Sequence, residues 1–104
     1  MSQDDQDATY ARLTREFFAI RNEMAAIRVE LRKIGEDFKS VGEHLTKGDP
    51  GNTLHDFGIL AGQAESAGRL SNRYSELLSD GQSRQAEVAR FSPEYPPLEF
   101  SHGD

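Results

Sequence analysis

The sequence predicts an all-α chain, folded as one long antiparallel helical hairpin (a coiled coil) that pairs with other helices into a four-helix bundle. Three observations support this prediction. Apolar residues recur in alternating three- and four-residue steps through the first half of the chain. A short segment rich in glycine and proline follows, and a second row of apolar and small residues continues after it. With 104 residues, the chain has room for one domain at most.

The first helix is expected over about residues 8–46, after an acidic segment 1–7 that is predicted to be disordered. Proline is absent from it, and its apolar row runs without a miss from Tyr10 to Leu45. A sustained row with this spacing is typical of a coiled coil. The residues expected at the interaction seam are Phe17, Ile20, Met24, Ile27, Leu31, Ile34 and Phe38.

A turn is predicted at 47–53, where Gly48 and Pro50 stand close together. The second helix is expected over about residues 54–80, or as far as 90, because Gly81 either breaks the helix or lies within it. Its apolar row is weaker and contains smaller side chains. The expected members are Leu60, Ala64, Ala67, Ser71, Tyr74, Leu78, Gly81 and Val88.

A short turn makes the two helices antiparallel neighbours. Folding the chain about residue 50 then sets large residues of the first helix opposite small ones of the second, such as Phe38 opposite Gly62. We therefore expect a close approach of the helix axes near the turn, which would also account for Gly35 and Gly42 inside the first helix.

Further apolar residues lie outside the two rows and predict a second apolar face. They are Phe18, Val29, Phe57, Leu70 and Leu77. An apolar surface this wide, left in water, is typical of an association site. The expected partners are a second copy of the chain or another helical protein.

The charge distribution excludes several classes of partner. The net charge of −6 comes from six acids in segments 1–7 and 92–104, so that the 12 remaining acids balance the 12 bases of the body. A neutral body is not typical of a nucleic-acid binder, which needs a basic stripe.

No apolar run is long enough to span a membrane. The expected location is the cytoplasm.

No chemistry-bearing motif is recognisable, so no catalytic, cofactor-binding or metal-binding residue is assigned and no enzyme is expected. The chain lacks cysteine. His44 and His55 flank the turn, but their spacing matches no metal-binding motif. A metal carrier is therefore the weakest of the functional hypotheses, since the seam positions are also apolar.

The segment 92–104 holds three prolines and is expected to be an extended tail. It carries a short apolar motif of Tyr95, Leu98, Glu99 and Phe100. Three interpretations stay open: the tail docks back on the helices, it is disordered, or it is a linear motif that a partner recognises.

The layout of 8–91, the aromatic–glycine step Phe57-Gly58 and the Tyr95–Glu99 string together resemble the small ESX-type proteins of type VII secretion. Those hairpins carry W-x-G in the turn and Y-x-x-x-D/E after the second helix, and they pair into four-helix bundles. Here the turn has no tryptophan, and prolines interrupt the string. The resemblance implies export without a cleaved signal peptide.

The sequence thus predicts a non-enzymatic helical protein-interaction module, self-associating or partner-binding. The alternative is a small, phage-like inhibitor that occupies a groove or active site of its target. The neutral body disfavours a DNA-mimicking version of that inhibitor.

Overall fold

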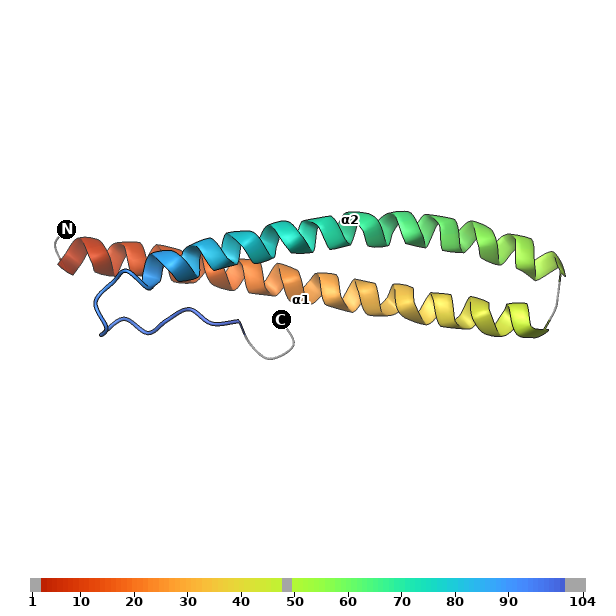
Figure 1. Ribbon diagram of the computed structural model, residues 1–104, viewed down its shortest axis with the longest axis horizontal. Coiled ribbons are helices and arrows are strands. Elements are labelled where there is room, and N and C mark those ends of the chain that lie inside the picture. Colours follow the sequence, from red (N-terminus) through yellow and green to blue (C-terminus); the bar gives the residue numbers. More distant parts are fainter. Residues whose placement is uncertain (1–2, 48–49, 101–104) are drawn as a thin grey trace. The chain divides into compact units, whose positions relative to one another are not determined.

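The computed structural model describes residues 3–47 and 50–100, with the side chains of Leu45 and residues 50–56 excepted. It contains two long helices, α1 (Gln3–Lys47) and α2 (Pro50–Val88) (Figure 1). No strand occurs in the described residues. The predicted all-α class with two long antiparallel helices is confirmed.

The helix bounds correct two predictions and settle a third point that the sequence left open. α1 begins at Gln3, so residues 3–7 are helical and not disordered; Asp4 and Asp5 in the first turn suit the positive end of the helix dipole. α2 begins at Pro50, where the proline supplies a preset φ and gives up an N–H that would have no helical partner. The predicted turn 47–53 is therefore too long, and the rest of it, residues 48–49, lies outside the described residues. α2 also runs unbroken through Gly81 to Val88.

The chain divides into two compact units. The terminal unit consists of Met1–Ala26 and Tyr74–Asp104, and the middle unit is Ile27–Arg73. In each unit, a segment of α1 lies antiparallel to a segment of α2 (Figure 1). The two units are described separately below.

The core of the terminal unit takes side chains from three segments: α1, α2 and the tail that follows α2. Its fully buried members are Leu13, Phe17, Ile20, Met24, Leu77, Val88 and Leu98. Phe17 and Met24 are only 2% and 0% exposed. The predicted seam is therefore fully covered in this unit.

The middle unit buries less. Its fully buried hydrophobic residues among those described are Ile27, Ile34 and Val41, all from α1 and seven residues apart. Leu31 is half-buried and Phe38 is 40% exposed. Phe38, one of the residues predicted at the interaction seam, is thus only partly covered in this unit.

The buried row of α2 differs from the predicted one. Leu77 is 2% exposed and Leu70 is half-buried, whereas Ser71 is exposed. Leu70 and Leu77 thus belong to the row that faces α1 and not to a second face. The residues that follow this row are Leu60, Gln63, Ala67, Leu70, Tyr74, Leu77, Gly81 and Val88.

The predicted close approach of the helices near the turn is also wrong. A methyl group built on Gly62 or Gly68 would contact no other part of the described structure within 4 Å, and the same holds for Gly35 and Gly42. These glycines therefore border open space and do not accommodate large side chains of the facing helix.

Candidate functional site

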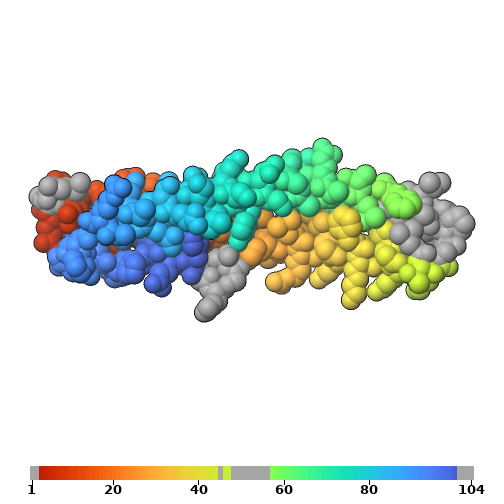
Figure 2. Space-filling model, viewed as in Figure 1, coloured from red at the N-terminus to blue at the C-terminus, as the bar shows by residue number. Residues whose placement is uncertain are grey.

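After α2, the chain reverses and returns along the helices of the terminal unit (Figure 1). The reversal is a tight turn in which the Tyr95 N–H donates to the Ser92 carbonyl at 3.0 Å. The Ser92 hydroxyl also donates to Glu94 at 2.9 Å. Residues 96–100 then run without regular secondary structure. Figure 2 shows this segment, in dark blue, lying against the C-terminal part of α2.

Aromatic rings hold the start of the returning tail. The centroid of Tyr10 lies 5.1 Å from that of Tyr95 and 6.4 Å from that of Phe91, and Phe91 and Tyr95 meet edge to face at 5.5 Å. Such tilted arrangements are the favoured ones for aromatic pairs. The cluster ties the end of α2 to the first turns of α1.

The Tyr95 hydroxyl donates a hydrogen bond to Asp7. This bond, followed by desolvation and by the nearby charges of Asp7, Glu94 and Asp4, raises the pKa of Tyr95 from 10.0 to about 12. Deprotonation of the phenol would remove the donor and place a second negative charge beside Asp7. The neutral form therefore favours the docked tail.

Two backbone carbonyls of the tail accept hydrogen bonds from helix side chains. The Tyr10 hydroxyl donates to the Pro96 carbonyl at 2.8 Å, and Gln85 Nε2 donates to the Leu98 carbonyl at 3.0 Å. One donor lies on α1 and the other on α2. The backbone of the tail is thus held by both helices.

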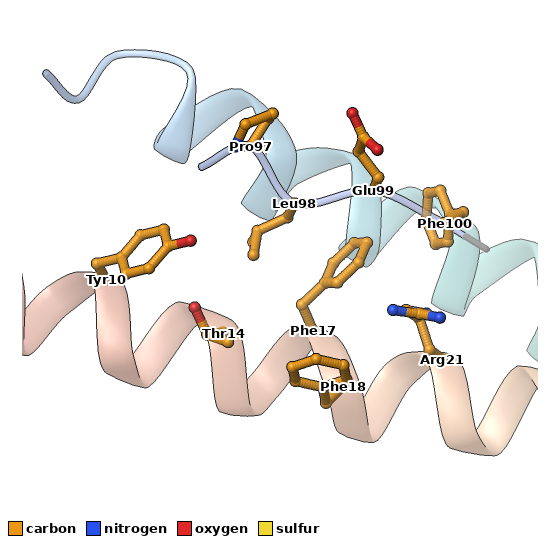
Figure 3. A pocket seen from close by; sticks show the side chains of 9 residues that line it. All are labelled: Tyr10, Thr14, Phe17, Phe18, Arg21, Pro97, Leu98, Glu99 and Phe100. Atoms are coloured by element: carbon orange, nitrogen blue, oxygen red, sulfur yellow. The ribbon is translucent and has the colours of Figure 1, made fainter. Parts of the chain in front are cut away.

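Leu98 and Phe100 provide the apolar contacts. Leu98 is 8% exposed and packs with Leu13, Phe17 and Val88, and Phe100 packs at the edge of this cluster. The rings of Phe17 and Phe100 lie 4.9 Å apart. Figure 3 shows the side chain of Glu99 directed away from that of Leu98.

Gly81 makes room for Phe100. A β-carbon built on Gly81 would lie 2.6 Å from Cζ of Phe100 and 3.5 Å from Cε2 of Phe17. The first distance is too short for any real contact. Gly81, for which the sequence left open a helix break, is therefore the place where an aromatic ring from the tail packs.

A hollow lies beside the tail on α1 (Figure 3). The residues that line it are Tyr10, Thr14, Phe17, Phe18, Arg21, Pro97, Leu98, Glu99 and Phe100. Phe18 is 52% exposed, and the Arg21 guanidinium lies 5.4 Å from its ring centroid. Arg21 and the acidic Glu99 face the same hollow from opposite segments.

The middle unit has two sides of different character. One side is hollowed and polar, and Gln63 Nε2 there donates to Asp37 Oδ2 at 2.6 Å. It is lined by Glu30, Lys33, Ile34, Asp37, Gln63, Ser66, Arg69 and Leu70. The Gln63–Asp37 bond joins the two helices, whereas Lys33 pairs with Glu30 within α1 and Arg69 contacts Ser66 within α2.

The other side of the middle unit is apolar, and we call it the open face. Successive residues of a helix are turned by about 100°. The open face is the side of the buried Ile27–Ile34 row that lies opposite to the side of Asp37. The open face consists of Leu31, Gly35 and Phe38 on α1 and of Leu60, Ala64 and Ala67 on α2. None of these residues is fully buried, and none is charged.

The remaining predicted site residues lie apart from one another. Val29 and Phe57 are 49% and 53% exposed in the middle unit, while Phe18 belongs to the terminal unit. No shared face of the predicted composition can be assigned to them. Of the tail motif, Tyr95, Leu98 and Phe100 contact the helices, which matches docking back, the first of the three interpretations of the tail.

Sequence reasoning missed the residues that receive the tail, above all Gln85 and Gly81. The only local signal was the density of large apolar residues in the tail. No cluster of three or more histidine or acidic side chains suited to a metal ion occurs in the part of the chain that the structure describes. Of the two histidines that flank the turn, His55 has its side chain outside that part. Within the same residues, neither helix has a stretch long and apolar enough to cross a membrane.

Comparisons with protein-family models, with curated proteins and with solved structures found no match to this chain. The resemblance to ESX-type hairpins therefore stays a prediction.

Proposed function

We propose that the protein is a non-enzymatic helical interaction module in which two copies pair through the open faces of their middle units to form a four-helix bundle. The observation that carries the proposal is the 40% exposure of Phe38 beside the half-buried Leu31. Both belong to the same heptad row as Phe17 and Met24, which the terminal unit buries completely. Exposed apolar residues that continue a core row are typical of an association surface.

The distribution of side-chain sizes favours a second copy as the occupant. The α1 edge of the open face carries the large residues Leu31 and Phe38. The α2 edge carries Ala64, followed outward by Ala61 and Gly68, and a β-carbon on Gly68 would meet nothing within 4 Å. A two-fold interface presents the same patch on both subunits, so the large residues of one copy would pack on the small residues of the other.

Charges at the rim suit the same arrangement. Arg32 and Lys39 are exposed at the α1 edge, whereas the exposed acid Glu65 lies toward the α2 edge. Setting α1 of one copy on α2 of the other brings opposite signs together. Exposed pairs of this kind contribute little energy, but they favour one alignment over others.

Solution mass tests the proposal. Light scattering with size-exclusion chromatography should give twice 11.6 kDa, with dissociation on dilution. Phe38→Ser should raise the dissociation constant of the dimer by about tenfold or more, which corresponds to about 1.4 kcal/mol or more. Val29→Ser is the matched control, since Val29 is at least as exposed as Phe38 but lies about 180° away around α1.

A mass of 11.6 kDa at every concentration would contradict self-pairing and would leave the open face for a different helical protein. Equal effects of Phe38→Ser and Val29→Ser would contradict the assignment of the face. Export by type VII secretion, which the ESX-type resemblance implies, is a separate prediction that a secretion assay in a host with that apparatus would test.

A further inference from the structure

The tail is held in the terminal unit in the way that a peptide ligand is held in a groove. Its two best-placed backbone carbonyls, those of Pro96 and Leu98, accept hydrogen bonds from Tyr10 and Gln85. Because these hydrogen bonds are made to backbone carbonyls, they can form with any extended segment that follows the same path, whatever its side chains. The donors come from two different helices, so the groove exists where α1 and α2 lie side by side.

Two sites in the groove, which we call seats, determine which side chains of a bound segment fit; they receive Leu98 and Phe100. Leu98 enters a buried seat formed by Leu13, Phe17 and Val88. Phe100, two residues on, lies over Gly81, the only described glycine at which a β-carbon would collide with a neighbour. In an extended chain, residues two apart point to the same side, so the groove reads a leucine and an aromatic residue separated by one position.

Two further features define the ligand. Pro96 and Pro97 precede the leucine and fix an extended backbone, which lowers the entropy lost on docking. The residue between the two seats is Glu99, whose exposed side chain points away from that of Leu98 (Figure 3). The groove therefore places no demand on the side chain at this middle position.

We infer that this groove is a peptide-recognition site for extended partner segments in which prolines precede a leucine and an aromatic residue that are separated by one position. The chain's own tail occupies the site in cis and competes with such partners. An attached ligand acts at an effective concentration in the millimolar range. A partner segment therefore binds only when it displaces the tail. This inference concerns the terminal unit and does not depend on the pairing of middle units.

The first test vacates the groove in the full-length chain with Leu98→Ser and Phe100→Ser together. The probe is a fluorescein-labelled peptide of residues 92–104, followed by fluorescence anisotropy. The vacated chain should bind the probe at least about tenfold more tightly than the unmodified chain, because the competing tail is gone. A probe carrying the same two serines should not bind.

A second substitution maps the binding to the groove. Gly81→Ala, added to the vacated chain, should weaken the probe about tenfold, since the new methyl group occupies the seat of the aromatic ring. Gly68→Ala is the matched control, because a methyl group there meets nothing within 4 Å. Failure of the vacated chain to bind the probe, with its helical circular dichroism unchanged, would overturn the inference.

If the vacated chain loses its helical signal, a cleavable chain decides the question. A protease site inserted at the 92–94 turn leaves every groove contact in place. After cleavage, the labelled peptide should exchange with the severed tail, which size-exclusion chromatography would detect as release of the original segment. A severed tail that never exchanges is an integral part of the core, and the recognition site would then be refuted.

Discussion

The terminal and middle units are built on the same heptad row of α1, yet they cover it to different extents. In the terminal unit, Phe17 and Met24 are buried to within 2% of their surface. In the middle unit, Leu31 and Phe38, which follow at the same seven-residue spacing, keep substantial exposure. The difference shows that α1 and α2 leave part of such a row in water in the middle unit, whereas the tail adds cover to Phe17 in the terminal unit.

The largest expected effect separates the two units directly. Phe17→Ala should lower the free energy of unfolding by about 3–5 kcal/mol, because it leaves a cavity in a closed core. Phe38→Ala should cost only about 1 kcal/mol, since its ring is already partly in water. Urea denaturation, followed by circular dichroism at the lowest workable protein concentration, would measure both without a contribution from association. Equal losses in the free energy of unfolding would show that the two units bury this row to the same extent.

A smaller effect is expected from the tail itself. Leu98→Ala should lower the free energy of unfolding by about 2 kcal/mol, the lower end for leucine truncation, because its seat is at the edge of the core. Glu99→Ala, at the exposed neighbouring position, should stay within about 0.5 kcal/mol. The same denaturation measurement compares the two variants. A tail that contributes nothing to the core would give the same small value for both.

Glycine-to-alanine substitutions sharpen the comparison further. Gly68→Ala in the middle unit should stabilise α2 by about 1 kcal/mol, since alanine is the better helix former and its methyl group has room. Gly81→Ala offers the same gain in propensity but forces Phe100 to move, so its net effect should be neutral or destabilising by about 1 kcal/mol. In a Phe100→Ala background, Gly81→Ala should recover the stabilisation. Thermal unfolding of the unmodified chain, of Gly81→Ala, of Phe100→Ala and of the double variant would complete this double-mutant cycle.

The smallest effect is a pH dependence confined to the terminal unit. The pKa of Tyr95 is raised to about 12 in the folded chain, against 10.0 for the free group. Its contribution to stability is therefore fully present below pH 10 and is lost as the pH rises towards 12. Spectrophotometric titration near 295 nm should show one late-titrating tyrosine that is absent from Tyr95→Phe. A tyrosine titration completed near pH 10 would contradict the hydrogen bond to Asp7.

Much of the fold was predictable from α1, because large side chains such as Ile27 and Ile34 mark its buried row without ambiguity. The row of α2 was predicted one position out in places. Ala64, Ala67 and Ser71 are small enough to satisfy either of two neighbouring rows, and only burial distinguishes Leu70 and Leu77 as the inward members. In a helix with few large side chains, the spacing of the apolar residues does not determine well which side of the helix is buried.

The docked tail was beyond prediction for a different reason. Periodicity reports structure over a few turns, whereas Tyr10 and Pro96 are 86 residues apart. The same limit hid the role of Gly81, since a lone glycine in a helix indicates either weakness or a close neighbour. The neighbour, Phe100, lies in a segment whose own sequence predicts no regular structure.

The contact between Asp7 and Tyr95, 88 residues apart in sequence, also orders events during synthesis. Chains emerge from the ribosome amino end first, and pairings between distant residues form slowly because a long loop must close. The middle unit, local in sequence, can form as soon as α2 begins to emerge. Phe17 and its neighbours, although made early, are covered only after Leu98 and Phe100 have emerged. A nascent or truncated chain that lacks the tail therefore exposes, near its amino-terminal end, apolar surface around Phe17 that is buried in the folded chain.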